Sequence, residues 1–175
     1  MRRVVLAAFA ACVSLAPWFP AHADAPPIQM GMRVYAFRPP GSNVTTILYG
    51  IYGQWALDPH WIVQGELDYA SWVDLAGQHN MTTVPVSGLF HFLPGRPFDP
   101  YAIAGLNYTS LRVSNASGIS GRGTVGGQLG VGFGLTTQVV GFSLEGRYFV
   151  PDLKHPEAGS MVWGGGASLG LGVSF

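Results

Sequence analysis

The chain has 175 residues and a formal net charge of zero at pH 7, and only 10% of its residues are charged although its mean hydropathy is +0.27. Soluble domains usually carry about 25% charged residues, and nucleic-acid-binding domains display a basic patch, so the composition argues against both classes. After the N-terminal segment there is also no continuous run of the roughly 18 apolar residues that a membrane helix needs. A transmembrane β-barrel, whose apolar residues are spread along the chain by alternation, reconciles these observations.

Residues 1–23 have the three parts of a secretory signal peptide: a basic Arg-Arg start, an apolar run, and a small-x-small cleavage site that ends at Ala23. We therefore expect cleavage after Ala23 and one mature barrel domain over 24–175. An uncleaved anchor is disfavoured because the apolar run is short and followed by prolines. A lipoprotein attached at Cys12 is disfavoured because the residues before it form an imperfect lipobox. Cleavage removes the only cysteine, so neither disulfides nor thiolate metal sites are expected.

After the signal segment, apolar residues alternate with polar or small residues in eight segments. These segments are 28–38, 44–57, 61–71, 82–93, 101–111, 123–136, 140–149 and 161–175. Alternation with a period of two predicts β-strands whose two faces meet different surroundings. An even number of strands of about 10 residues is typical of a membrane barrel. We therefore expect an all-β fold, an eight-stranded antiparallel up-and-down transmembrane barrel with its apolar face toward lipid.

The connections between these segments alternate in character. Tight turns lie at 58–60 and 137–139 and a proline-rich turn at 94–100, whereas the connections at 39–43, 72–81, 112–122 and 150–160 are polar and mostly longer. Outer-membrane barrels have short periplasmic turns and longer external loops, so we expect periplasmic termini and Phe175 at the periplasmic rim. Aromatic rings favour the two headgroup zones. The lipid-interface aromatics expected from this arrangement include Trp61, Tyr69, Tyr108, Tyr148 and Trp163.

A soluble, lipocalin-like barrel is the alternative fold, with its apolar face inside and its polar face in water. The polar face argues against it, because this face carries few charges and includes a row of glycines. That row is Gly126, Gly130, Gly132 and Gly134. Glycines suit a crowded interior better than a surface in water.

Several strands resemble those of a known group of proteins. Residues 100–111, 126–135 and 143–153 are similar to the fifth, sixth and seventh strands of small bacterial outer-membrane barrels of the OmpA/OmpW-like superfamily, and 32–39 resembles a first strand of OmpW-like proteins. The resemblance implies an outer-membrane location and an assembly signal at the C-terminus, where alternating apolar residues end on Phe. The residues that match this signal are Leu169, Leu171, Val173 and Phe175.

The chain offers little for catalysis. Lipid A deacylases share this overall plan and carry a His-x-Ser-Asn element, but His-x-Ser occurs nowhere in this sequence. A base beside a hydroxyl nucleophile is the minimum for acyl transfer, so we do not expect an enzyme, and a lipid A-modifying activity is a disfavoured alternative. The loop residues His79, Asp74, His155, Glu157 and Asp152 lack metal-site spacing. No cofactor or metal is expected.

Five charged residues lie on the polar faces of the predicted strands: Arg33, Glu66, Asp68, Glu145 and Arg147. Glu66 and Asp68 are two apart on one strand and could serve acid–base chemistry. Since the interior of an eight-stranded barrel is filled by side chains and a buried charge must be paired, the sequence favours an internal charge network that is purely structural.

The function expected from this reading is that of an integral outer-membrane barrel with a structural or surface role. Inward-facing amide side chains, together with His91, favour a plug of hydrogen bonds inside the barrel. The amides are Gln29, Gln54, Gln64, Asn107 and Gln128. The alternative is an OmpW-like conduit for small hydrophobic molecules, for which Leu48, Ile62, Leu89 and Ile103 would supply apolar patches. Expected partners are outer-membrane lipids including lipopolysaccharide and, during biogenesis, the barrel assembly machinery. We expect a monomer and no nucleic-acid partner.

Overall fold

The computed structural model describes residues 28–39, 42, 44–75, 77–136 and 140–171. Eight strands make up nearly all of this part of the chain. They are β1 (Ile28–Phe37), β2 (Thr46–Ala56), β3 (Trp61–Asp74), β4 (Gly77–His91), β5 (Phe98–Asn115), β6 (Gly118–Thr136), β7 (Val140–Val150) and β8 (Ser160–Leu171). A short 3-10 helix, η2 (Pro156–Ala158), precedes β8. The predicted signal peptide lies outside the described residues.

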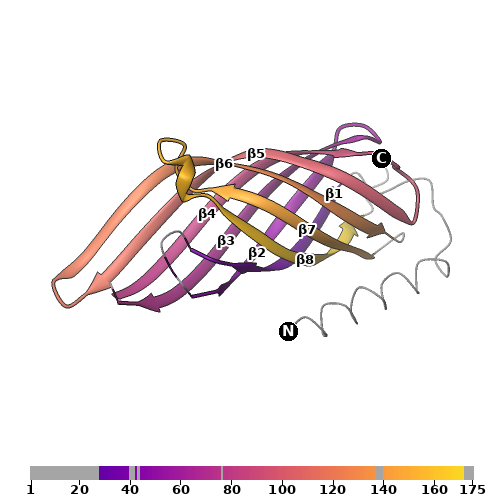
Figure 1. The fold of residues 1–175 in the computed structure, drawn as a ribbon. Coiled ribbons are helices and arrows are strands. Elements are labelled where there is room, and N and C mark those ends of the chain that lie inside the picture. Colours follow the sequence, from indigo (N-terminus) through magenta and orange to yellow (C-terminus); the bar gives the residue numbers. More distant parts are fainter. Residues whose placement is uncertain (1–27, 40–41, 43, 76, 137–139, 172–175) are drawn as a thin grey trace.

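Each strand pairs in antiparallel fashion with its neighbours in the sequence, and β8 closes the barrel against β1 (Figure 1). In the closing pair, Arg33 lies opposite Gly166 and Ile28 opposite Leu171. Closure leaves no free sheet edge, so the backbone groups of every strand can be satisfied inside the sheet, as a membrane requires. The prediction of an eight-stranded antiparallel barrel is confirmed. No helix in the described part of the chain is long and apolar enough to cross a membrane.

The predicted loops at 72–81 and 112–122 are wrong, because these residues are mostly strand. Trp72 pairs with His79, Arg112 with Gly121, and Gln78 of β4 with Ser114 of β5, so β3 to β6 continue as one four-stranded sheet almost to the tips of the two hairpins. The β5–β6 hairpin projects furthest from the barrel (Figure 1). Its strands have 18 and 19 residues, whereas β1 has 10. We call the end of the barrel that carries these hairpins the hairpin end.

Side chains alternate between the two faces of the wall as the sequence predicted. In β1, Met30, Met32 and Val34 are exposed on the outer face, whereas Arg33 and Tyr35 are buried inside. Along the other strands apolar side chains likewise face outward, while the inward set holds polar and small residues together with buried apolar ones such as Leu48, Trp72 and Leu89. The outer face is therefore a surface for lipid, and whatever the barrel does internally depends on the inward set.

Glycines on the inner face provide room for large rings. A Cβ atom added at Gly132 would lie 2.6 Å from Tyr101 Cζ, and one added at Gly31 would lie 2.6 Å from Tyr52 Cζ. Real Cβ atoms do not approach so closely, because close-packed interiors tolerate little overlap. Gly132, from the row that the sequence placed inside, and Gly31 on β1 are thus the seats of inward-facing tyrosines, whereas Gly130 lies against Arg147.

Candidate functional site in the barrel interior

Four of the five predicted interior charges meet in the middle of the lumen. Arg33 Nη1 lies 3.2 Å from Glu66 Oε2 and 3.3 Å from Glu145 Oε2. From β7, Arg147 Nε donates to Glu145 Oε2 at 2.7 Å, and Arg147 Nη1 donates to Glu66 Oε1 at 2.7 Å. Each arginine therefore contacts both glutamates, and all four side chains are buried. Such mutual pairing offsets the high cost of removing charges from water.

Tyrosine hydroxyls complete the coordination of Glu145. Tyr35 OH donates to Glu145 Oε2 and Tyr101 OH donates to Glu145 Oε1, both at 2.7 Å. The Arg33 guanidinium also lies over the Tyr52 ring, 3.8 Å from its centroid, a cation–π arrangement. Alternation along the strands places Tyr35 and Tyr52 on the inner face, but nothing in the sequence indicates their contacts with the network. The alternation of β5 likewise points Tyr101 inward, but its bond to Glu145 depends on the stagger between strands, which the sequence does not give.

Predicted amides extend the network across the lumen. Gln64 Oε1 accepts from Arg33 Nη2 at 2.9 Å and from Gln54 Nε2 at 2.7 Å, while Gln64 Nε2 donates to Glu66 Oε1 at 2.6 Å. On the other side, Gln128 Oε1 accepts from Arg147 Nη1 at 3.3 Å. Charged side chains and amides from β1, β2, β3, β6 and β7 thus form one hydrogen-bonded layer across the barrel.

The fifth predicted charge, Asp68, is buried but lies outside the ion pairs. Its Oδ1 atom has no hydrogen-bond partner among the described residues. The carboxylate lies against Gly50, where an added Cβ would collide with it. Because two arginines face three acids, Arg33 and Arg147 cannot neutralise the whole set. The structure brings the network together without Asp68.

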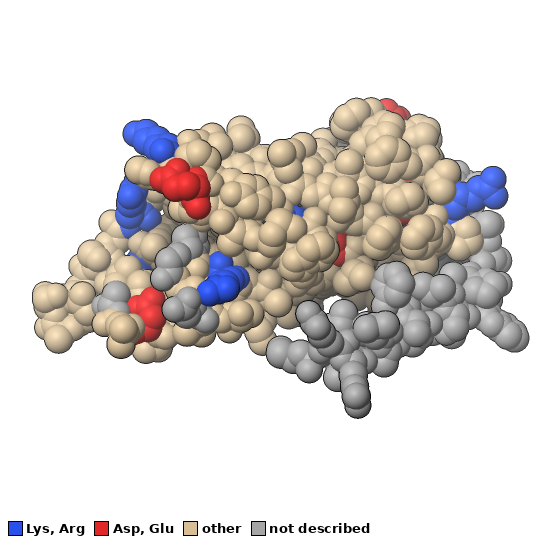
Figure 2. Space-filling view, in the orientation of Figure 1, with Lys and Arg blue, Asp and Glu red and all other residues tan. Residues whose placement is uncertain are grey.

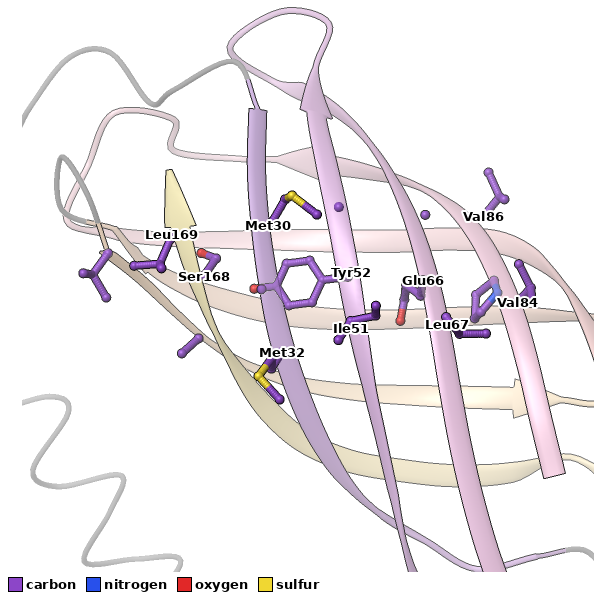
Figure 3. Close-up of a pocket in the computed structure, with 16 residues that line it drawn as sticks. Met30, Met32, Ile51, Tyr52, Glu66, Leu67, Val84, Val86, Ser168 and Leu169 are labelled. Carbon is purple, nitrogen blue, oxygen red and sulfur yellow. The ribbon is translucent and has the colours of Figure 1, made fainter. Parts of the chain in front are cut away.

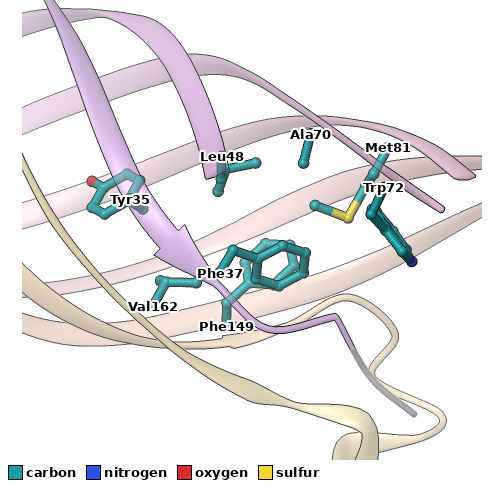
Figure 4. Close-up of a cluster of buried hydrophobic side chains, with 8 residues drawn as sticks. All are labelled: Tyr35, Phe37, Leu48, Ala70, Trp72, Met81, Phe149 and Val162. Carbon is teal, nitrogen blue, oxygen red and sulfur yellow. The ribbon is translucent and has the colours of Figure 1, made fainter. Parts of the chain in front are cut away.

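An apolar cluster fills the lumen on the hairpin side of the charged layer (Figure 4). Phe37 lies at its centre, edge-to-face with Trp72 at 6.3 Å and with Phe149 at 6.1 Å between ring centroids. The other buried members are Tyr35, Leu48, Ala70, Met81 and Val162. These side chains come from six strands, β1, β2, β3, β4, β7 and β8, so the cluster extends across the lumen.

A second, smaller cluster lies on the opposite side of the charged layer. It consists of Leu89, Tyr101 and Ile103, with the partly buried Ile62 against them. Next to it, His91 stacks on Tyr101 and its Nδ1 lies 2.7 Å from Asp99 Oδ2. The interior is therefore layered: an apolar cluster at the hairpin end, a charged layer, and a smaller apolar cluster with polar groups near the turns.

The whole barrel, with its strands and its interior, corresponds to a known family. The family model for the outer membrane protein β-barrel domain matches residues 5–175. The chain belongs to this family. No curated protein sequence matches the chain closely enough to count as a relative.

Several solved structures share this fold at low sequence identity. The N-terminal β-barrel domain of Pseudomonas aeruginosa OprF is 18% identical with a TM-score of 0.57, over 83% of this chain and 98% of that one. Neisserial surface protein A is 14% identical with a TM-score of 0.61, over 82% and 96%. OprG from Pseudomonas aeruginosa is 11% identical with a TM-score of 0.59, over 86% and 98%. The predicted membership of the OmpA/OmpW-like group is confirmed.

As expected for a member of this outer-membrane family, the outer wall is apolar with aromatic residues toward its ends. Trp61, Tyr108, Tyr148 and Trp163 are exposed on the outer face, and Tyr69 faces outward with its hydroxyl donating to Asn80 Oδ1 at 2.8 Å. On the face in Figure 2, most charged side chains gather toward the ends of the barrel and the wall between them is mainly uncharged.

The predicted assembly signal is described only in part. Leu169 is exposed on the outer face and Leu171 pairs with Ile28 in the closing strand pair. Val173 and Phe175 lie outside the described residues. The role of these four residues in assembly stays a prediction.

A pocket of about 760 Å³ lies at β1–β4 and β8 (Figure 3). Most of its lining side chains belong to the exposed outer set, among them Met30, Met32 and Leu67. Two outward-facing glycines, Gly53 and Gly65, have open space where a Cβ would be. The pocket is therefore mainly a hollow of the lipid-facing wall and not a passage along the lumen.

The titratable loop residues form pairs in the structure. His79 Nε2 lies 2.9 Å from Asp74 Oδ1, and His155 Nδ1 lies 3.1 Å from Glu157 Oε1. The side chain of His79 also stacks on Trp72. Among the residues described by the structure, no three His, Cys, Asp or Glu side chains are grouped as metal ligands.

Proposed function

We propose that the protein is a non-catalytic outer-membrane barrel with a closed lumen, and that its role is structural or at the cell surface. The layered interior carries this proposal. Buried pairs between arginines and glutamates occupy the middle of the lumen, and the Phe37 cluster lies above them. An ion or small hydrophobic molecule moving along the axis would have to break both layers.

Conductance of the full-length protein in planar lipid bilayers tests the closed lumen. The refolded barrel should add no steady current over a wide range of voltage, while heat-modified gel mobility verifies that it is folded. Stable conductance steps from a folded sample would overturn the proposal and favour the conduit. Uptake of small hydrophobic molecules into vesicles that contain the barrel would do the same for an apolar substrate.

The proposal includes a monomeric barrel in contact with outer-membrane lipids, delivered by the barrel assembly machinery. The alternation of Leu169, Leu171, Val173 and a terminal aromatic, Phe175, supports this route. Phe175→Ala should reduce the amount of folded barrel in outer membranes, while refolding of the purified variant in detergent stays as for the wild type. Equal amounts of both proteins in the membrane would contradict the role of Phe175.

A further inference from the structure

One charged residue stands on the lipid-facing side of the wall. Among the outward-facing positions of the eight strands as described, every residue except Arg112 is apolar, small or uncharged. All other strand charges belong to the inward-facing set, including Arg122 on the adjacent strand. A charge on the lipid face of a barrel is costly near the membrane midplane and much less costly at the interface, so the height of Arg112 on the wall matters.

Arg112 lies beyond the outward-facing aromatic zone, toward the hairpin end. It follows the exposed Tyr108 by four residues on β5. At about 3.3 Å per residue and a tilt of roughly 45°, that places Arg112 about 9 Å further along the membrane normal. Tyrosines mark the start of the headgroup zone. The guanidinium is therefore at the level of lipid headgroups, above the hydrocarbon.

Nothing in the described part of the protein neutralises this arginine. The side chain is exposed, and no hydrogen bond or ion pair within the described residues engages its guanidinium. Its cross-strand neighbours are Asn80 on β4 and Gly121 on β6. Gly121 has no side chain that could cover the guanidinium. Asn80 Oδ1 accepts a hydrogen bond from Tyr69 OH, so the Asn80 NH₂ group is a second hydrogen-bond donor beside Arg112.

We infer that Arg112 and Asn80 bind a phosphate group of lipopolysaccharide, on its lipid A portion. A guanidinium offers two parallel N–H donors that match phosphate oxygens, and the adjacent amide and the Ser110 and Thr82 hydroxyls suit a phosphorylated sugar. The inference rests on the proposed outer-membrane location and on the orientation predicted from the sequence, in which the termini are periplasmic and the hairpin end lies on the extracellular side, at the leaflet that carries lipopolysaccharide. The surface is built for an anionic headgroup, because it has a free cation and donors but no acid on the same face.

The test is binding of defined lipids to the full chain in detergent, measured by native mass spectrometry. Wild type should bind diphosphoryl lipid A about tenfold more tightly than Arg112→Gln does. Arg122→Gln is the matched control: it removes an arginine from the same hairpin whose Nη2 already bonds Asp152 Oδ2 at 2.6 Å. The control should bind lipid A as wild type does. Heat-modified mobility shows that all three proteins are folded.

Two further lipids show where the affinity comes from. Dephosphorylated lipid A tests the need for phosphate, and phosphatidylglycerol tests whether any anionic lipid is enough. Both should bind wild type and Arg112→Gln equally and weakly. Equal binding of diphosphoryl lipid A to the two proteins would overturn the inference. So would an equal loss in Arg122→Gln, or phosphatidylglycerol binding as tightly as diphosphoryl lipid A. A conducting lumen would overturn the proposed function and leave this result untouched.

Discussion

At the scale of single residues, Arg147 is the side chain on which the charged layer depends most. It bonds Glu66 and Glu145 through different nitrogens, and its removal leaves Arg33 alone against both glutamates. Breaking a buried pair by removing one partner costs about 3–5 kcal/mol. Arg147→Met should lower the free energy of unfolding by that amount, read as a lower temperature of heat-modified mobility. Arg96→Met, which replaces an exposed arginine in the turn before β5, is the control. An unchanged transition in Arg147→Met would refute the structural role of the network.

Glu66 and Asp68, two of the inward carboxylates of β3, should respond differently to neutralisation. Glu66 accepts hydrogen bonds from Arg33, Arg147 and Gln64, so Glu66→Gln removes one acid from two arginines and should destabilise the barrel by about 3–5 kcal/mol. Asp68 makes no ion pair in the described structure, and its Oδ1 is unsatisfied. Asp68→Asn removes a surplus buried charge and should leave stability unchanged or raise it. Urea titrations of both variants would show this, and a loss in Asp68→Asn as large as in Glu66→Gln would contradict it.

How far the site was predictable from sequence follows from these residues. Alternation assigns Glu66, Asp68 and Arg33 to one face because strand side chains repeat every two residues. It does not say how neighbouring strands are staggered, and the stagger decides which acid meets which arginine. That is why Asp68 was placed in the network and why the contacts of Tyr101 with Glu145 were missed.

At the scale of the strand, glycines have different roles on the two faces. Gly132 faces inward beneath Tyr101, whereas Gly65 faces outward with open space at its Cβ position. Gly132→Val should displace Tyr101 from Glu145 and cost about 1–3 kcal/mol through overpacking. Gly65→Val should be neutral or slightly stabilising, since a β-branched residue suits a strand. Comparing their unfolding midpoints checks this, and equal midpoints would mean that Tyr101 moves without cost.

The strand boundaries were less predictable than the strands. The sequence favours polar loops at 72–81 and 112–122, yet these residues are paired strand, and Trp72 and Met81 still belong to the buried cluster in the lumen. Once these strands leave the hydrocarbon, no apolar surrounding selects one face, so the alternation fades while the backbone pairing continues. Inside the membrane every backbone group needs a partner, and lipid selects one apolar face of each strand. There the alternation was strong enough to predict all eight strands.

At the scale of the whole molecule, the apolar cluster and the charged layer are two successive barriers along one axis. They depend on different physics: the cluster excludes water by packing, and the charged layer holds its position by ion pairs and hydrogen bonds. Phe37 belongs to the cluster alone, with its ring against Trp72 and Phe149. Removing it should therefore affect stability without opening the lumen.

Phe37→Ala tests this separation of the two barriers. A buried phenylalanine replaced by alanine costs about 3–5 kcal/mol, so the unfolding midpoint should fall clearly. In planar bilayers the variant should nevertheless remain closed, because Arg33, Glu66, Glu145 and Arg147 still cross the lumen beneath the cavity. Conductance in folded Phe37→Ala would show that the charged layer is permeable and that the aromatic cluster alone closes the barrel. A closed but destabilised variant places the barrier in the ion pairs.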